Sequence, residues 1–133
     1  MLIYIDTNVW IDYFYNRVDR LRPLGDFSFN LLKSSADCKY TILISKWLLV
    51  ELEKYVSEED IKIIFEWLKS KKKIIFVSSN KEDIIKSKRY LHWHDAYHAI
   101  LAQKGGAKYF VTRNIKDFSD FRNWFQVVFP ENL

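Results

Sequence analysis

The chain has 133 residues, of which 49% are hydrophobic and 17% aromatic, and its formal net charge is +4. A chain of this size and composition buries a substantial core, which excludes an intrinsically disordered protein. The single cysteine, Cys38, excludes an intramolecular disulfide and a cysteine-rich zinc site, and it fits a reducing compartment. With only 3 glycines and 2 prolines, we expect no flexible linker and one domain over residues 1–133.

The positive net charge has two interpretations, which are simple solubility and attraction to a polyanion such as RNA. The first predicted strand begins at residue 2, with no basic segment before it and no long apolar run in the chain. We therefore expect no signal peptide, no membrane span and a cytoplasmic location.

Apolar runs and helical patterns alternate along the chain. The first run, residues 2–5, leads directly into Asp6, Thr7 and Asn8, so Asp6 falls at the carboxyl end of a buried strand. Further strands are expected over residues 40–44, 74–77, 109–111 and 125–129. Helices are expected over residues 7–15, 27–36, 46–56, 58–70, 81–91 and 94–104, with Ser45, Ser57 and Asn80 or Ser79 as N-caps. This alternation predicts an α/β fold with a parallel sheet of four to five strands.

Acidic and amide side chains recur where these strands end. They are Asp6, Glu51, Asp95, Asn114 and Asp117. The carboxyl ends of parallel strands share one edge of the sheet, where ligands bind in open α/β folds. Clustered carboxylates repel one another, and a hard cation such as Mg²⁺ or Mn²⁺ removes that repulsion. Such an ion can also activate a water for attack on a phosphodiester.

Four motifs in order give the sequence a resemblance to PIN domains, most closely to toxin ribonucleases of the VapC type. They are Ile5-Asp6-Thr7-Asn8, Leu49-Val50-Glu51-Leu52, Asp95-Ala-Tyr-His98-Ala and Val111-Thr112-Arg-Asn114-Ile-Lys-Asp117-Phe118. The resemblance implies a three-layer α/β/α fold with strand order 3-2-1-4-5. It implies an endoribonuclease that depends on Mg²⁺ or Mn²⁺, acts as the toxin of a toxin–antitoxin pair, and has RNA, a cognate antitoxin and a second copy of itself as partners.

By this resemblance, Asp6, Glu51 and Asp95 match the catalytic, metal-binding acids. Thr112 and Asn8 match supporting polar residues. Asn114 departs from the pattern, because family members often have Asp there. Asp117 is a further candidate ligand. Without a fourth acid a second metal ion is not expected, whereas Asp6, Glu51 and Asp95 still suffice for one ion.

Each of these residues also has a purely structural interpretation. Asp6, Asp95 and Asp117 are suited to capping helices or turns, and Glu51 to a solvated helix surface. His92, His94 and His98 have spacings that can bind zinc, but no matching partner ligands follow.

Basic residues near the predicted site are candidates for phosphate contacts. Arg113 and Lys116 flank the corner after residues 109–111, and we predict that they bind RNA. A basic helix face carries Lys81, Lys86, Lys88 and Arg89, for which solvation is an equal alternative. The lysines within residues 69–73 are interpreted as a solvated helix end.

Two other functional classes compete with the nuclease. One is a catalytically degenerate PIN domain that binds RNA or protein, which the amide at Asn114 favours. The other is a phosphate-transfer module built on a strand-end aspartate. That class expects a second aspartate where Asn8 stands, or a phospho-acceptor after the strand 74–77, and neither is present.

Overall fold

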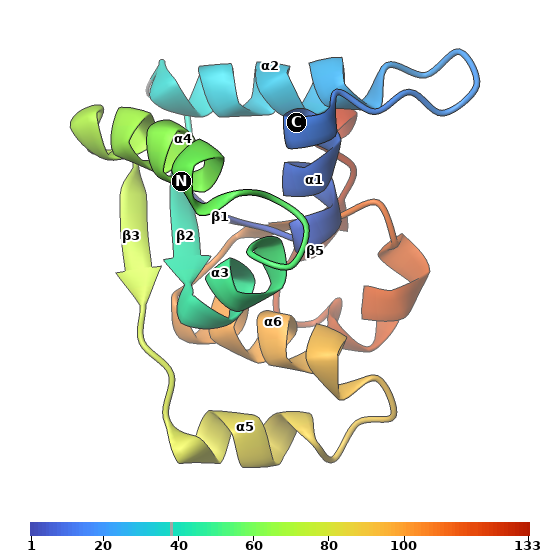
Figure 1. Cartoon of the computed structure of the whole chain (residues 1–133). Helices are drawn as coiled ribbons and strands as arrows, with labels where there is room; N and C mark the ends of the chain where they lie inside the picture. The colour runs from blue at the N-terminus through green and yellow to red at the C-terminus, as the bar shows by residue number, and fades with distance from the viewer. Residues whose placement is uncertain (38) are drawn as a thin grey trace.

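The computed structural model describes residues 1–37 and 39–133, so the prediction made for Cys38 lies outside the described residues (Figure 1). The strands are β1 (Leu2–Ile5), β2 (Thr41–Ser45), β3 (Ile74–Val77), β4 (Tyr109–Val111) and β5 (Gln126–Val128). The α-helices are α1 (Thr7–Tyr15), α2 (Leu24–Ala36), α3 (Lys46–Leu52), α4 (Glu58–Ser70), α5 (Lys81–Ser87) and α6 (Trp93–Lys104). Two 3₁₀ helices, η1 (Ile115–Phe121) and η2 (Pro130–Asn132), lie near the C-terminus. Among these helices none is both long and apolar enough to cross a membrane.

All neighbouring strands pair in parallel, in the order β3-β2-β1-β4-β5. This confirms the predicted α/β class and strand order. The strand β1 is central, with Ile3 opposite Ile42 of β2 on one side and Tyr109 of β4 on the other. Because every strand runs the same way, the residues that follow β1, β2 and β4 meet at one edge of the sheet.

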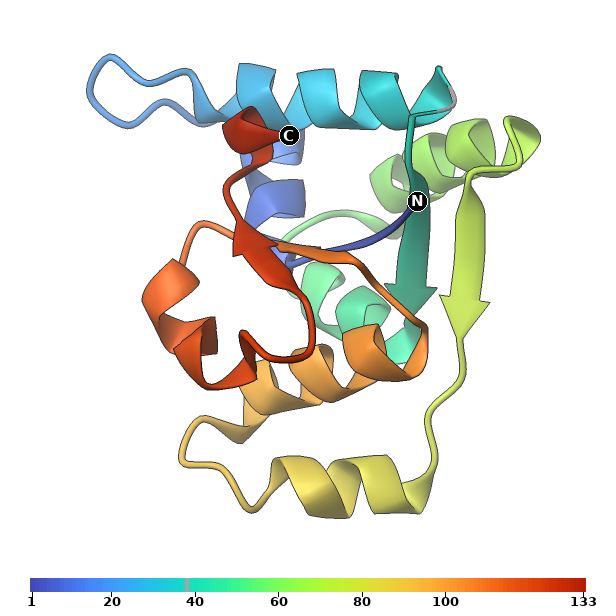
Figure 2. The ribbon, with the colours of Figure 1, turned by 180° about the vertical axis from the view of Figure 1, so that it is seen from behind.

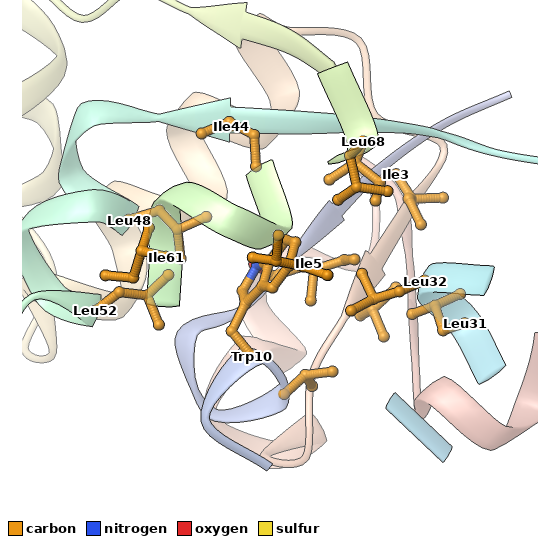
Figure 3. Packing of buried hydrophobic residues seen from close by; sticks show 14 of the residues in the cluster. Ile3, Ile5, Trp10, Leu31, Leu32, Ile44, Leu48, Leu52, Ile61 and Leu68 are labelled. Atoms are coloured by element: carbon orange, nitrogen blue, oxygen red, sulfur yellow. The ribbon is translucent and has the colours of Figure 1, made fainter. Parts of the chain in front are cut away.

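The sheet is buried between two layers of helices, as Figures 1 and 2 show from opposite sides. Alternate residues of the central strands point to opposite faces. Ile3 and Ile5 pack with the apolar residues of α1, α2, α3 and α4, as Figure 3 shows for Trp10 and Leu68. Tyr4 points to the other face, into a second cluster formed by α6 and η1. The three-layer arrangement predicted from the sequence is therefore confirmed.

Three helices have different ends from those predicted. The helix α2 begins at Leu24, directly after Pro23, and not at Phe27. Gly25 lies in the first turn of α2, where a Cβ would come within 2.5 Å of the Asn16 side chain. The helices α3 and α5 end at Leu52 and Ser87, several residues before the predicted ends.

The predicted N-caps of three helices are confirmed. Ser57 accepts a hydrogen bond from the Asp60 N–H, and Asn80 forms a reciprocal capping box with Asp83. Ser45 accepts from the Leu48 N–H at 3.1 Å and so fixes the first turn of α3. This last cap has a second role, because the Ser45 hydroxyl also belongs to the network beneath the candidate site.

Candidate active site

Asp6 lies at the carboxyl end of β1 and also caps α1. Its Oδ1 accepts the Thr7 N–H at 2.8 Å, and its Oδ2 accepts the Thr112 hydroxyl at 2.9 Å. The residue is 6% exposed. Burial raises the pKa of Asp6, and His98 and the hydrogen bond from Thr112 counteract part of that rise. Asp6 therefore serves as both a cap and a site residue, so its two interpretations are compatible.

Glu51 lies on α3, the helix that follows β2, and is joined to the Asp6 corner through Thr7 and His98. One carboxylate oxygen, Oε1, accepts the Thr7 hydroxyl at 2.8 Å and also hydrogen-bonds to His98 Nε2. Burial opposes ionisation of Glu51, but the bonds from His98 and Thr7 outweigh it, so its pKa lies below the ordinary value. Glu51 is thus held as a carboxylate, unlike a solvated surface glutamate.

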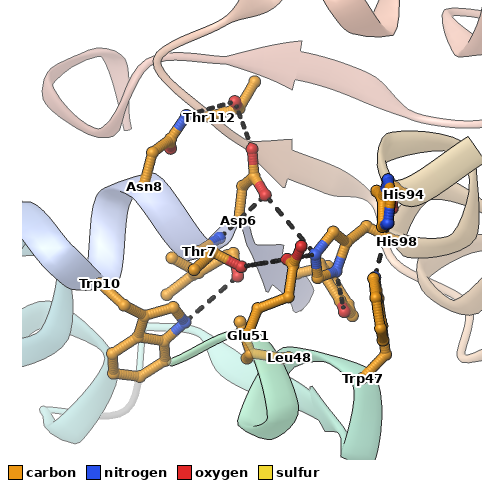
Figure 4. A network of polar contacts seen from close by, with 12 residues as sticks. Asp6, Thr7, Asn8, Trp10, Trp47, Leu48, Glu51, His94, His98 and Thr112 are labelled. Atoms are coloured by element: carbon orange, nitrogen blue, oxygen red, sulfur yellow. Dashed lines mark hydrogen bonds and ion pairs between the residues drawn. The ribbon is translucent and has the colours of Figure 1, made fainter. Parts of the chain in front are cut away.

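A chain of buried hydrogen bonds runs from Glu51 back to the cap of α3 (Figure 4). His98 Nδ1 lies 2.7 Å from the Tyr4 hydroxyl, which lies 2.7 Å from the Ser45 hydroxyl. The Glu51 carboxylate can only accept, so His98 Nε2–H donates to it. When the His98 imidazole is neutral, its Nδ1 accepts from the Tyr4 hydroxyl, and Tyr4 in turn accepts from Ser45, whose oxygen also accepts the Leu48 N–H.

Asp95 lies in the first turn of α6 but does not cap that helix, whose N-cap is His92. Burial, followed by the charges of Asp6 and Asp117, raises the pKa of Asp95 to about 6. Asp95 thus experiences the repulsion of its carboxylate neighbours without a hydrogen bond that offsets it among the described residues. Its position favours the site interpretation over the capping one.

The three acids line one pocket of about 350 Å³ at the carboxyl edge of the sheet. Its lining residues are Asp6, Thr7, Asn8, Ile11, Arg17, Glu51, Lys54, Tyr55, Asp95 and Asn114. Asp6 Oδ1 lies 3.9 Å from His98 Nε2, the nitrogen that also contacts Glu51. Two of the acids therefore face the same nitrogen, and Asp95 adds charge at the mouth of the pocket.

The donor set of this pocket fits a hard divalent cation in its chemistry. All three acids offer carboxylate oxygens, the ligands that Mg²⁺ and Mn²⁺ prefer. The raised pKa of Asp95 reflects burial first and then repulsion by neighbouring carboxylates, which a cation would relieve. Within residues 1–37 and 39–133, however, no three His, Cys, Asp or Glu side chains already surround a common point. A bound ion would require Glu51 or Asp95 to turn its carboxylate toward Asp6.

The supporting residues lie where the motif order places them. Thr112 is buried, donates to Asp6 and accepts the Asn114 N–H at 3.0 Å. The Asn8 side chain bridges to the same corner by accepting the Arg113 N–H at 3.3 Å. Asn114 lines the pocket, whereas Asp117 is exposed in the first turn of η1 and acts on Asp95 through its charge.

The two predicted RNA contacts have different surroundings. The Arg113 side chain is 12% exposed and pairs with Asp12 at 3.2 Å and with Glu131. Its guanidinium is thus engaged within the protein, where it joins α1 to the C-terminal turn η2. Lys116 is exposed on η1.

The three histidines do not come together. His98 is 1% exposed and faces Glu51, whereas His92 is exposed at the start of α6. His94 stacks on Trp93 with ring centroids 3.8 Å apart. The described part of the chain thus gives a histidine zinc site no geometric support.

Several residues of the site were given no role in it by the sequence-based prediction, although Thr7 and His98 lie in the quoted motifs and Ser45 was a predicted N-cap. Thr7, His98, Tyr4 and Ser45 form the supporting network, and Arg17 and Lys54 line the pocket beside the acids. One signal was available for His98, since it interrupts an apolar run in α6 just one turn after Asp95. Nothing in the sequence marks Arg17 or Lys54, because both lie in segments with no motif.

No known family model matches the sequence, and no curated protein matches it. Several solved structures match, and two of them are similar over nearly the whole chain. One is VapBC2 from Rickettsia felis bound to a DNA fragment from its promoter, with 20% identity, a TM-score of 0.65, and coverage of 96% of this chain and 98% of that chain. The other is VapBC-1 from nontypeable Haemophilus influenzae, with 16% identity, a TM-score of 0.62, and coverage of 98% of both chains. Together with the strand order 3-2-1-4-5, this likeness shows that the chain has the PIN-like fold.

Proposed function

We propose that this protein is a ribonuclease that cleaves RNA phosphodiesters with the help of Mg²⁺ or Mn²⁺, and that it is the toxin of a toxin–antitoxin pair. The observation that carries the proposal is the convergence of Asp6, Glu51 and Asp95 on one pocket at the carboxyl edge of the sheet. These acids come from segments more than 40 residues apart, and nothing in their own packing requires them to meet. The PIN-like fold and the four motifs in order support the same assignment.

The protein's own residues have distinct tasks in this reaction. His98, Thr7 and Thr112 hold Glu51 and Asp6 by hydrogen bonds, and both acids line the pocket. A divalent ion bound there would supply an activated water and offset the charge of the phosphodiester. Arg17 and Lys54, which line the same pocket, are suited to bind the flanking phosphates.

Partners follow from the same comparison. The similar structures carry the double name VapBC, and the sequence resemblance is to the VapC type. We therefore propose a cognate antitoxin as protein partner, a homodimer as the assembled state and a cytoplasmic location.

A cleavage assay tests the proposal. Mixed transfer and ribosomal RNA is incubated with wild type and with Asp95→Asn, in Mn²⁺, in Mg²⁺ and in EDTA. We expect cuts that need the ion and that fall at least a hundredfold in the variant, since a catalytic acid is lost. Metal-independent cuts, or undiminished cuts by Asp95→Asn, would contradict the proposal.

A second candidate is a catalytically degenerate domain that binds RNA or protein. Asn114 favours it, because an amide stands where the resembling family often has an acid, and so does the absence of a ready-made ligand cluster among the described residues. This candidate predicts RNA binding with a salt dependence but no turnover in either ion. Restoring activity with Asn114→Asp would distinguish a weakened nuclease from a pure binding module.

A further inference from the structure

A second pocket, of about 670 Å³, borders the candidate active site on the side of β3 and α5. We call it the lysine–aromatic groove and define it by the rings of Trp47, Phe76 and Trp93 and the side chains of Lys46, Lys81 and Lys88. Its surface is mostly apolar, and the loop after β3 adds polar groups from Ser78 and Asn80.

Phe76 is the most accessible ring of this groove. It lies near the carboxyl end of the edge strand β3, and the residue is 58% exposed. In the part of the chain that the structure describes, no other aromatic ring stacks on it. An exposed phenylalanine at the ligand-binding edge of a parallel sheet is a free platform for a flat apolar ligand.

The opposite wall of the groove is rigid and also aromatic. The Trp47 ring lies 5.6 Å from Trp93 and 5.3 Å from Tyr97, with interplanar angles of 30° in both cases. Its indole N–H donates to the His94 carbonyl at 3.2 Å, so the ring is fixed in place. Lys88 Nζ lies 5.3 Å from the centre of the Trp93 ring. A fixed aromatic wall with a cation beside it is typical of sites where nucleic acid bases stack.

The positive charge of the groove favours a polyanion over a second copy of this chain as its occupant. Three lysines line it, and no lining residue is acidic. If two copies met through this face about a twofold axis, the lysines of one copy would face those of the other, which disfavours that contact. A polyanion with flat apolar bases satisfies both the lysines and the exposed rings, and single-stranded RNA has this chemistry.

The groove lies beside the acid pocket. Trp47 and Glu51 are four residues apart on α3 and so lie on one helix face, about one turn from each other. The Trp47 ring lies 6.0 Å from the ring of His98, which contacts Glu51, and Figure 4 shows the three side chains side by side. A strand of RNA that crosses the acids can therefore reach the groove with a neighbouring nucleotide.

We infer that the lysine–aromatic groove binds an unstacked base of single-stranded RNA next to the scissile phosphodiester, with Phe76 as the stacking platform and Lys81 and Lys88 as phosphate contacts. The inference rests on the proposed ribonuclease function and adds a substrate subsite to it. It implies that the enzyme selects single-stranded or loop segments over duplex RNA, because a paired base cannot enter the groove.

The test measures RNA binding without turnover. A labelled single-stranded RNA of about 12 nucleotides is titrated in EDTA and followed by fluorescence anisotropy. Phe76→Leu keeps an apolar side chain but removes the ring, and we expect its Kd to rise about tenfold, since each stacked base contributes substantially to affinity. Phe76→Trp retains a platform and should bind like wild type. Trp67→Leu, on the exposed surface of α4, is the matched aromatic control and should change nothing.

The lysines are tested by salt dependence. In Lys81→Gln/Lys88→Gln, the slope of log Kd against log salt should fall by about 0.7 for each lysine, whereas Lys69→Gln/Lys72→Gln should keep the wild-type slope. A duplex of the same sequence should bind more weakly than the single strand and respond little to Phe76→Leu.

The outcomes separate this inference from the proposed function. Phe76-dependent binding supports the groove even if no RNA is cut in Mn²⁺, a result that would contradict only the nuclease. Equal binding by wild type and Phe76→Leu, or no RNA binding at all, would overturn the inference. If Phe76→Leu instead converts a dimer to a monomer in sedimentation while RNA affinity stays constant, the groove is a protein interface and the inference is wrong.

Discussion

Glu51 and Asp95 lie in the same pocket, yet their surroundings move their pKa values in opposite directions. His98 and Thr7 donate to Glu51, and its pKa is lowered. For Asp95, burial and the charges of Asp6 and Asp117 outweigh the favourable charge of His98, and its pKa rises to about 6. The comparison indicates that one acid is satisfied by the folded protein, whereas the other depends on something that binds. A cation would serve that purpose.

The largest expected loss of stability comes from removing His98, which donates a hydrogen bond to Glu51. His98→Leu leaves the Glu51 carboxylate and the Tyr4 hydroxyl without their shared partner in a buried site. We expect the free energy of unfolding to fall by about 3 kcal/mol, because an unpaired buried charge is costly. Urea unfolding at pH 7.5 measures it, with His92→Leu at the exposed start of α6 as control. A loss below about 1 kcal/mol would show that the network does not hold Glu51 in place.

A smaller loss of stability is expected at Tyr4, the next residue in the chain of hydrogen bonds. Tyr4→Phe removes only the hydroxyl that links His98 to Ser45. We expect a loss of about 1–2 kcal/mol, since two buried polar atoms lose a partner while the ring still packs on Phe110. In an unfolding experiment that combines it with His98→Leu, the two losses should be less than additive. Full additivity would mean that the hydroxyl and the histidine act independently.

Replacing Asp95, in contrast to replacing His98, should increase the stability of the fold. The Asp95 pKa of about 6 in the folded protein exceeds the ordinary value of 3.8, so folding favours the protonated form. The ionised carboxylate therefore destabilises the fold above about pH 6, and this penalty disappears as the pH falls toward 4. Asp95→Asn should raise the free energy of unfolding by about 1 kcal/mol at pH 7.5, a value reduced for partial exposure.

The pH dependence is the control for that prediction. Near pH 4 the variant and wild type should be equally stable, whereas Asp120→Asn on the exposed surface of η1 should match wild type at both pH values. A loss of stability in Asp95→Asn at pH 7.5 would show that Asp95 has a favourable partner in the folded protein.

The smallest effect is stabilisation by the ion itself. At a concentration about threefold above its Kd, Mn²⁺ should add about 0.8 kcal/mol to the free energy of unfolding of wild type. Asp95→Asn should gain much less, because it loses one of the oxygen ligands. Thermal unfolding with and without Mn²⁺, with Ca²⁺-free buffer and EDTA as reference, measures this difference. Equal gains in both proteins would place the ion elsewhere.

The sequence was sufficient for the scaffold and for the positions of the acids. Buried strands appear as short apolar runs, and in a parallel sheet the residue after each run must lie at the ligand-binding edge, so Asp6 and Thr112 were predictable. The start of α2 was not, because Gly25 signals a loop in sequence terms but here allows close contact with Asn16.

The hydrogen-bond network around the acids could not be predicted from sequence periodicity. Tyr4 and His98 are 94 residues apart, and their contact depends on the tilt of α6 across the sheet. The pairing of Arg113 with Asp12 and Glu131 was unpredictable for the same reason, because it depends on where the C-terminal turn η2 lies. Residues that act through distant side chains give no periodic or spacing signal.

The most direct test of the account is to count bound Mn²⁺ by electron paramagnetic resonance in wild type, Asp95→Asn and Asp120→Asn at pH 7.5. The account predicts that wild type and Asp120→Asn bind Mn²⁺ with the same affinity, and that Asp95→Asn binds at least tenfold more weakly. Failure of wild type to bind Mn²⁺, or binding that Asp95→Asn leaves unchanged, would contradict the claim that these acids form a cation site.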